Sequence, residues 1–208
     1  GETLITGIGQ GYTQTTPLQL CLMTAQLANG GFKIYPKIIF DENNKSVEEI
    51  KSIIEKNSKN LEERSELLDF FNKKEHERLF DNSKNIKLVR EAMFASTNEV
   101  RGTSYSSRIE DPKYQFAGKT GTSQVKRITL LDRELDLKTL EIPYNERDHA
   151  LYIAFGPYKN PRYALSIVIE HGGSGSSAAA PIAKKLFKLI IDRHELREQA
   201  RIQKNIKV

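Results

Sequence analysis

The sequence predicts an α+β fold in which an antiparallel sheet packs against helices. Residues 150–155 and 163–169 are runs of apolar, β-branched and aromatic side chains, the strongest strand signals in the chain. The short connection at 157–161, with its prolines and asparagine, predicts that these strands form an antiparallel hairpin. A third extended segment lies at 114–125, and several other stretches show helical spacing. Three strands flanked by helices are typical of the α+β class.

The first well-marked helix is expected to begin after Thr16. The Thr16 side chain can accept a hydrogen bond as an N-cap, Pro17 suits the first helical position, and Gln19 completes a capping-box pattern. Apolar residues then recur at helical spacing until Gly30 and Gly31, which favour a helix end. This helix therefore has both a start signal and a stop signal.

Two later stretches also show helical spacing. Residues 86–98 place Val89, Met93 and Phe94 on a face that we expect to point inward, and an Arg-Gly-Thr sequence then breaks the pattern. Residues 178–191 repeat the pattern near the C-terminus. We expect both stretches to pack as helices against the sheet.

The remaining segments are expected to lack a helix or to lie outside the core. The first eleven residues are glycine-rich and start with a strand-like run, which indicates a close backbone approach more than a helix. Residues 32–40 are β-branched and aromatic and are expected to be extended. Polar insertions are expected at about 41–85 and 126–146, and a basic tail at 193–208.

The composition is that of a soluble globular domain. With 38% hydrophobic and 28% charged residues, the 208-residue chain can bury one sizeable core or two small ones. The only cysteine, Cys21, excludes an intramolecular disulfide, and the four histidines lack metal-ligand spacing, so we expect no metal and no cofactor. No apolar run approaches the length of a membrane span, and no signal peptide is visible. We interpret the strand-like start without Met as a cut within a longer chain.

The formal net charge of +5 is uneven, because basic residues collect in the tail. Such a tail can contact nucleic acid or anionic lipid, or it can be the solvated end of a helix. We interpret it as a solvated helix end and expect no nucleic-acid partner. The aromatic residues of the hairpin are likewise interpreted as sheet packing and not as a stacking platform for bases.

Residues 118–123, which read Gly-Lys-Thr-Gly-Thr-Ser, form the most informative segment. Gly-Lys-Thr can end a phosphate-binding loop, but that loop needs a glycine five positions earlier, where Lys113 stands. It also needs a helix directly after the Lys-Thr pair, whereas Gly121 and the residues after it are poor helix formers. We therefore expect this segment to be extended.

On a strand, Lys119 and Gly121 point to one face, and Thr120 and Thr122 point to the other. Gly121 would let a ligand lie close to the backbone. A lysine amine and hydroxyls beside an open strand edge suit a substrate carboxylate. The pattern is that of the Lys-Thr-Gly strand of serine penicillin-recognising enzymes.

Further blocks accompany this strand in a fixed order along the chain. They read Gly-Gln-Gly-Tyr at 9–12, Thr-Pro-Leu-Gln at 16–19, Ala-Asn-Gly-Gly at 28–31, Arg-Asp-His-Ala-Leu-Tyr at 147–152, Phe-Gly-Pro-Tyr at 155–158, Glu-His-Gly-Gly at 170–173 and Ala-Ala-Pro-Ile at 179–182. With Lys-Thr-Gly, these blocks resemble the C-terminal part of the transpeptidase domain of class B penicillin-binding proteins. The elongation-type members, penicillin-binding proteins 2, are the most similar. The resemblance covers 1–39, 86–124 and 147–192.

The resemblance implies a peptidoglycan D,D-transpeptidase, with an incomplete domain in this chain. In that family a serine attacks the D-Ala-D-Ala bond of a stem peptide, and an amine of a neighbouring stem resolves the acyl-enzyme into a cross-link. β-Lactams acylate the same serine. By this resemblance, Lys119 and Thr120 belong to the pocket electrostatics and proton network, and Gly121 lies between the ligand-binding residues. The hydroxyls of Thr120 and Thr122 would hold the substrate carboxylate, and the Thr122 amide would be an oxyanion donor.

The family's Ser-x-x-Lys nucleophile and Ser-x-Asn element lie upstream of the Gly-Gln-Gly-Tyr block. We therefore expect both to be missing here, and the chain alone to be inactive. Residues 123–126 fit Ser-x-x-Lys, but positions three apart on a strand face opposite sides. Ser-x-Asn occurs at 58–60, 83–85 and 96–98, all after that block, and we interpret these as chance matches.

Family members are usually anchored in the bacterial inner membrane with this domain in the periplasm. The resemblance thus implies that location, stem peptides and β-lactams as ligands, and cell-elongation membrane proteins as partners. Because the family's first two strands precede this segment, the strand at 163–169 is expected to have an open edge through which the chain self-associates. A serine β-lactamase, which shares Lys-Thr-Gly, and a non-catalytic binding or scaffold module are the alternatives.

Two polar clusters also have alternative interpretations. The Arg-Asp-His sequence at 147–149 can belong to a catalytic triad, but we expect a structural ion-pair cluster at a strand start. The glycine- and serine-rich segment 172–177 can bind an anion ahead of a helix, but we expect a mobile turn.

Overall fold

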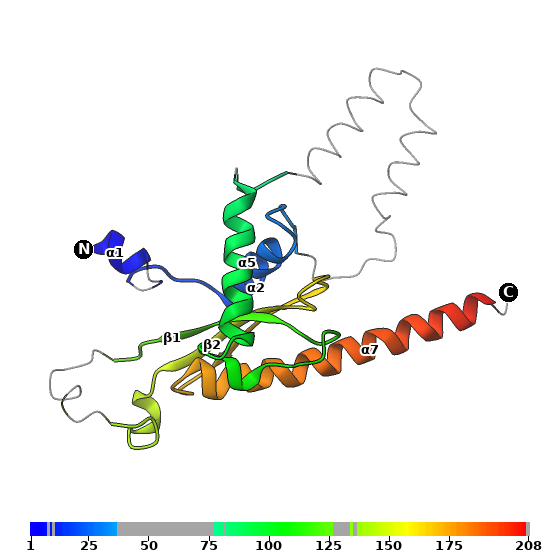
Figure 1. Cartoon of the computed structure of the whole chain (residues 1–208). Coiled ribbons are helices and arrows are strands. Elements are labelled where there is room, and N and C mark those ends of the chain that lie inside the picture. Colours follow the sequence, from blue (N-terminus) through cyan, green and yellow to red (C-terminus); the bar gives the residue numbers. More distant parts are fainter. Residues whose placement is uncertain are drawn as a thin grey trace.

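The chain forms a three-stranded antiparallel sheet with helices on both faces (Figure 1), which confirms the predicted α+β class. The strands are β1 (Ala117–Ser123), β2 (His149–Gly156) and β3 (Tyr163–Ile169), in the spatial order β1-β2-β3. The predicted hairpin joins β2 to β3, and β1 pairs with the other side of β2. The computed structural model describes residues 1–7, 9, 11–36, 77–80, 82–126, 134 and 137–206.

Helix α2 (Pro17–Ala28) begins and ends where the sequence predicts. The Gln19 amide donates to Thr16 Oγ1 over 3.2 Å, and the Thr16 amide donates to Gln19 Oε1 over 2.8 Å. This capping box satisfies amide groups that a helix start otherwise leaves unpaired. After the helix, Gly30 and Gly31 both have a φ of +93°, a conformation that glycine adopts at least cost.

One face of the sheet is covered by the long helix α7 (Ala180–Ile206). Tyr152 of β2 and Phe116, just before β1, pack on this face. The rings of Phe116 and Phe187 stack with 4.8 Å between their centroids, and both side chains are fully buried. The C-terminal half of α7 continues beyond the sheet (Figure 1), so the predicted basic tail is helical as far as the helix is described.

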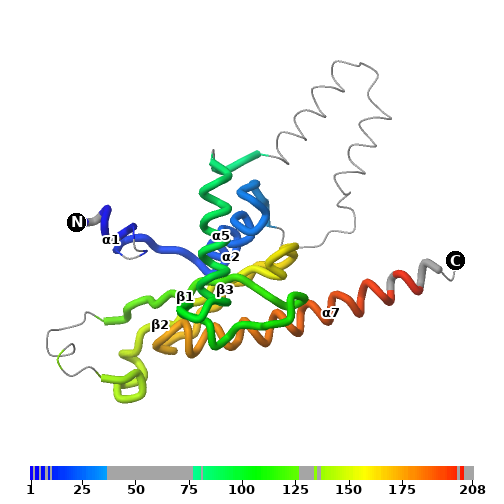
Figure 2. Tube along the Cα trace, viewed as in Figure 1, coloured from blue at the N-terminus to red at the C-terminus, as the bar shows by residue number. Residues whose placement is uncertain are grey.

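The opposite face is covered by α2 and by α5 (Ser83–Asn98). Phe155 of β2 and Ala117 of β1 pack there against Ala28 and Met93, which come from the two helices. Figure 2 shows the C-terminal end of α5 reaching the sheet, close to β1. This placement brings the end of α5 to the strand that carries Lys-Thr-Gly.

A short helix, α1 (Glu2–Gly7), stands where the sequence predicted a strand-like segment, so that prediction is wrong. The glycines that suggested an extended chain serve the turns after the helix, because Gly9 and Gly11 have φ angles of +77° and +89°. Helix α1 projects away from the sheet (Figure 1). Leu4 in this helix is 79% exposed, and hydrophobic spacing does not reveal the helix.

The predicted inward face of α5 is only partly right. Met93 is buried and Phe94 is half-buried, but Val89 is 41% exposed. The buried stripe instead runs through Ile86, Met93 and Thr97, at intervals of seven and four residues. A fully buried threonine in this stripe is not expected from hydrophobic spacing.

The segment at 172–177 is only partly a turn, and the predicted mobility stays a prediction. It leads into a π-helical turn, η3 (Gly175–Ala179), in which Gly175 is buried. A Cβ on Gly175 would lie 2.3 Å from the Leu151 carbonyl oxygen, so a glycine is needed for this close contact with the sheet.

Several expectations involve residues outside the described part of the chain. Of residues 32–40, only 32–36 are described, and Phe32 forms an isolated bridge with Arg78 in place of a strand. Most of the predicted insertion at 41–85 also falls outside, as do 127–133 and 135–136 of the predicted insertion at 126–146. Their boundaries therefore stay predictions.

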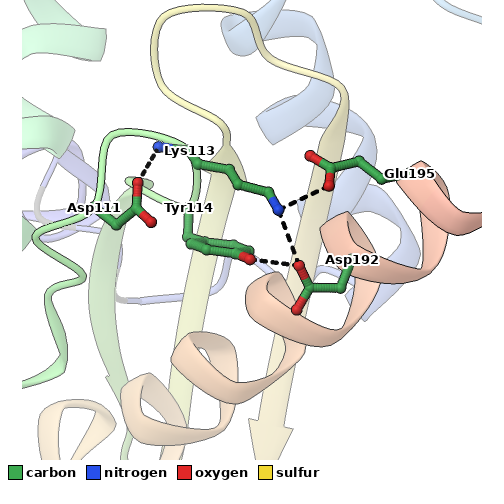
Figure 3. A network of polar contacts seen from close by, with 5 residues as sticks. All are labelled: Asp111, Lys113, Tyr114, Asp192 and Glu195. Carbon is green, nitrogen blue, oxygen red and sulfur yellow. Dashed lines mark hydrogen bonds and ion pairs between the residues drawn. The ribbon is translucent and has the colours of Figure 1, made fainter.

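Polar contacts fasten α7 to the loop before β1 (Figure 3). Lys113 Nζ pairs with Glu195 over 2.7 Å and with Asp192 over 3.2 Å, and the Tyr114 hydroxyl donates to Asp192. The Lys113 amide donates to Asp111 over 2.9 Å, which shapes the turn. Hydrogen bonding to Glu195, together with Tyr114 and Asp192, raises the pKa of Lys113. The Tyr114 hydroxyl and then Lys113 lower the pKa of Asp192.

Candidate functional site

The Lys-Thr-Gly segment lies extended on β1, as the sequence predicts. Lys119 is opposite Ile153, which packs on the face of α2 and α5, and Thr120 is opposite Tyr152, which packs on the face of α7. Because side chains alternate along a strand, Lys119 and Gly121 share the face of α2 and α5. The alternative of a phosphate-binding loop is wrong, since β1 continues beyond the Lys-Thr pair where that loop needs a helix.

The end of α5 covers the first half of the outer edge of β1. Asn98 Nδ2 donates to the Phe116 carbonyl over 2.9 Å, and the Gly118 amide donates to Thr97 Oγ1 over 3.0 Å. Polar side chains of a helix thus occupy alternate positions where a neighbouring strand would otherwise bond. These bonds also establish that the backbone groups of Phe116 and Gly118 point away from β2.

Among the described residues, the part of the edge that α5 leaves uncovered begins at Thr120. Alternate residues of an antiparallel strand direct their backbone groups to the same side, so Thr120 and Thr122 face the same edge as Gly118. The Thr120 carbonyl accepts a hydrogen bond from Lys119 Nζ over 2.7 Å, which agrees with that direction. The Lys119 side chain is exposed, and no carboxylate of the described residues pairs with it.

A line of hydroxyl groups connects the end of α5 to Lys119. Ser96 Oγ lies 3.3 Å from Thr103 Oγ1, which in turn lies 3.2 Å from Thr120 Oγ1. Lys119 Nζ lies 3.4 Å from Thr120 Oγ1. The Lys119 amine therefore donates to the carbonyl and hydroxyl oxygens of Thr120, at the end of this line of hydroxyl groups.

Two hollows lie along this part of the sheet. The larger, of about 940 Å³, is lined by Gly121, the residues after it on β1, and Leu151. Its other wall comes from the N-terminal segment, including Gly9 and Gly11 of the Gly-Gln-Gly-Tyr block, and from the start of α2. The second hollow, of about 490 Å³, is lined by Lys119 and by the exposed side of α5. The edge of β1 thus opens onto one hollow that is rich in Thr, Gln and Ser side chains and onto a second that is largely apolar.

The chance matches to catalytic motifs occupy unrelated positions. Residues 123–126 follow the end of β1 and do not start a helix, and Lys126 Nζ bonds Glu146 over 2.7 Å. The match at 83–85 begins α5, and the match at 96–98 ends it with side chains bonded to β1. The match at 58–60 lies outside the described residues.

The expected ion-pair cluster at 147–149 is wrong. Arg147 donates to the carbonyls of Ile142 over 2.8 Å and Leu140 over 3.3 Å. Asp148 accepts the Val125 amide over 3.2 Å, and His149 Nδ1 accepts an amide of the following turn over 2.9 Å. Each side chain satisfies backbone groups of a nearby loop, which explains why charged residues stand here without pairing with one another.

Three site residues were missed from the sequence: Thr97, Ser104 and Tyr152. All three are buried, and their hydroxyl groups form a cluster behind Gly118. The signal that could have indicated them is the polar run Ser-Thr-Asn at the end of an otherwise amphipathic helix, followed by Gly-Thr-Ser. Such a run signals a polar contact, but not the partner that it contacts.

The described residues contain no group of three or more His, Cys, Asp or Glu side chains arranged to hold a metal ion. None of the described helices combines the length and the apolar character that a membrane crossing requires.

Comparison with known proteins identifies the class of protein that carries this fold and site. The chain belongs to the penicillin binding protein transpeptidase domain family, whose model matches residues 1–188. The peptidoglycan D,D-transpeptidase MrdA of Salmonella typhimurium is 33% identical over 192 residues, which are 92% of this chain and 27% of that protein. MrdA of Escherichia coli is 28% identical over 196 residues, 92% of this chain and 26% of that protein.

Solved structures of penicillin-binding proteins are also similar to this chain. Pseudomonas aeruginosa PBP2, in complex with WCK 5153, aligns with a TM-score of 0.59 at 31% identity, over 88% of this chain and 31% of that chain. Helicobacter pylori PBP2, in complex with MreC, aligns with a TM-score of 0.59 at 28% identity, over 93% of this chain and 27% of that chain. The chain thus spans about a quarter to a third of the length of these relatives.

Proposed function

We propose that this chain is the C-terminal part of a serine-type peptidoglycan D,D-transpeptidase of the elongation type, which cross-links stem peptides in bacterial cell-wall synthesis. Relatives named for that activity, at up to 33% identity, support the proposal. The observation that carries it is the edge of β1: it is covered as far as Gly118 and open at Thr120 and Thr122, beside the exposed Lys119. An open edge of this kind can receive an extended peptide.

The residues of β1 have distinct roles in this proposal. Lys119 supplies positive charge and takes part in the proton network with Thr120, a role that their contact of 3.4 Å supports. The hydroxyls of Thr120 and Thr122 bind the substrate carboxylate, and Gly121 allows the close approach. The Thr122 amide, which faces the open edge, donates to the oxyanion. Removing one such donor typically costs about 3 kcal/mol of transition-state stabilisation.

The proposal also covers the organisation of the chain. Residues 1–208 form the C-terminal part of a transpeptidase domain, with polar insertions at about 41–85 and 126–146 and a basic tail at 193–208. The Ser-x-x-Lys nucleophile belongs to the preceding part of the domain. The chain alone is therefore expected to be inactive.

The proposed location is the periplasmic face of the bacterial inner membrane, with an anchor outside this chain. Ligands are peptidoglycan stem peptides, and β-lactams when the serine is present, with no nucleic acid involved. Cell-elongation membrane proteins are the proposed partners, which the MreC complex of the Helicobacter pylori protein supports. The chain alone is proposed to self-associate through β3, because β3 pairs with β2 only among the described strands.

Fluorescent penicillin labelling of the complete protein tests the function. A transpeptidase is expected to label and to retain the acyl group, a β-lactamase to hydrolyse it quickly, and a scaffold module not to label. The present chain alone is expected to stay unlabelled. Replacing Lys119 with Ala should abolish labelling, whereas replacing the exposed Lys159 in the β2–β3 turn should not. Unchanged labelling of Lys119→Ala would overturn the site assignment.

A further inference from the structure

The side chains of Thr97, Ser104 and Tyr152 form a buried cluster directly behind the site. Thr97 and Ser104 are fully buried, and Tyr152 is 1% exposed. The Tyr152 hydroxyl lies 3.0 Å from Thr97 Oγ1 and 3.0 Å from Ser104 Oγ. Three hydroxyls at the centre of a core are costly unless each is hydrogen-bonded, so their arrangement is constrained by the partners available.

The shortest contacts in the cluster define one continuous order of donors. Ser104 Oγ donates to the Ser96 carbonyl over 3.0 Å, so it has no second proton and accepts from Tyr152. Tyr152 has then used its proton and accepts from Thr97 over 3.0 Å, a shorter contact than those of Thr97 with the Met93 and Gly118 carbonyls at 3.4 and 3.5 Å. Thr97 Oγ1 has a free lone pair, to which the Gly118 amide donates over 3.0 Å. The chain of donors runs from Gly118 through Thr97, Tyr152 and Ser104 to the carbonyl of α5.

The Tyr152 hydroxyl is protonated as this order requires. Burial raises the pKa of Tyr152, although its hydrogen bonds with Ser104 and Thr97 act in the opposite direction. A neutral phenol donates one hydrogen bond and accepts another. The cluster is therefore fully satisfied without any charge, and it includes a backbone group of β1 as its first donor.

The cluster ends at the residue next to Lys119. Gly118 is the last residue of β1 whose outer backbone groups are held by α5, and Thr120 and Thr122 are the next residues that face the same edge. A displacement of Gly118 along or away from the sheet would also displace Thr120 and Thr122, because the backbone between them is a continuous strand.

We propose that Thr97 is a positioning residue of the transpeptidase site: through its bond to Gly118, backed by Tyr152 and Ser104, it holds the Lys119 side chain and the Thr122 amide in register with the ligand. This inference rests on the proposed function. Thr97 touches no substrate in this proposal, and it acts only through the backbone of β1. A rigid support of this kind is what a site needs when small displacements reduce transition-state stabilisation.

Acylation kinetics of the complete protein with fluorescent penicillin test the inference. In Thr97→Val the hydroxyl is lost at nearly constant volume, and the Gly118 amide has no acceptor. The acylation rate constant at saturating penicillin is expected to fall about tenfold, while the affinity of the non-covalent complex stays nearly constant. Thr97→Ser keeps the hydroxyl and should restore the rate to about the wild-type value.

Thr24→Val is the matched control. Thr24 is also fully buried in a helix, but its hydroxyl donates only to the Leu20 carbonyl of the same helix, over 2.7 Å. It should lower the melting temperature without slowing acylation. If Thr97→Val acylates at the wild-type rate, or if Thr24→Val slows it equally, the positioning role is wrong.

Two further outcomes keep the inference and the proposed function separable. If Thr97→Val does not fold, Tyr152→Phe takes its place, because it keeps the ring but removes the hydroxyl group that backs Thr97 at 3.0 Å; an unchanged rate then overturns the inference. If the wild-type protein does not label at all, the proposed function and this inference both fail. If the wild type labels and Thr97→Val acylates at the wild-type rate, the inference is wrong but the proposed function stands.

Discussion

The ring of Tyr152 occupies the space that a side chain on Gly118 would need. A Cβ on Gly118 would lie 2.4 Å from the Tyr152 hydroxyl oxygen and 2.5 Å from the ring carbon that bears it. The φ of Gly118 is not in the left-handed region, so this glycine is required by the close approach and not by backbone conformation. Gly121 is different, since its nearest neighbour would be Leu151 Cβ at 3.3 Å.

The first prediction compares these glycines. Gly118→Ala is expected to lower the free energy of unfolding of the protein by about 3 kcal/mol, because the Tyr152 ring is buried and cannot move aside. Gly121→Ala should cost less than about 1 kcal/mol, since a shift of a few tenths of an ångström accommodates it. Urea unfolding measures both. Equal losses in the two variants would contradict the assigned role of Gly118.

The second prediction concerns the pH dependence of the network between α7 and the loop before β1. The folded pKa of Asp192 is lowered by the Tyr114 hydroxyl and Lys113, so the stability that it contributes is present above its unfolded pKa. This contribution is lost as the pH falls through the folded pKa. The difference in melting temperature between wild type and Asp192→Asn should thus be small but measurable at neutral pH, and should vanish once the pH is below the folded pKa.

Thermal scans across this pH range check the prediction. The control is Glu170→Gln, because Glu170 is exposed and belongs to no ion pair among the described residues. Glu170→Gln should not show this pH-dependent difference in melting temperature from the wild type. A wild-type advantage over Asp192→Asn that grows on acidification would contradict the sign.

The third prediction concerns the open edge of β3. Since Gly118 directs its amide away from β2, the alternation across the sheet turns the backbone groups of Ala164, Ser166 and Val168 to the free side of β3. Cys21 Sγ donates to the Ala164 carbonyl over 3.5 Å, which agrees with this direction. Val168 is 37% exposed at that edge.

Light scattering of the 208-residue chain over a range of concentrations tests this edge. The chain is expected to self-associate, and Val168→Lys should shift it toward the monomer, because a lysine opposes strand addition. Leu189→Lys changes an equally apolar exposed position on α7 and should have no such effect. A chain that stays monomeric at high concentration would refute the pairing through β3.

Local patterns were sufficient wherever one short segment contains all the information. The capping box between Thr16 and Gln19 involves residues three positions apart, and the β2–β3 hairpin is encoded by two apolar strands around a short turn. The same patterns failed for α1, whose Leu4 is 79% exposed, and for Val89, whose exposure depends on what the sheet leaves uncovered.

The candidate site was also predicted from the sequence only in part. Lys119, Thr120, Gly121 and Thr122 could be placed on one strand from their own sequence, with the faces that alternation requires. Thr97 and Tyr152 could not be found, because the bonds of Thr97 to Gly118 and to Tyr152 connect residues 21 and 55 positions apart. No periodicity or turn signal links positions at such separations.

By itself, the sequence determined that Lys-Thr-Gly lies on a strand of an antiparallel sheet, because side-chain branching, glycine placement and turn chemistry act over a few residues. Only the tertiary structure decided where the edge of that strand is closed and where it is open. The division between Gly118 and Thr120 follows from the docking of α5 on the sheet, which brings Thr97 and Asn98 to backbone groups that local sequence leaves unassigned.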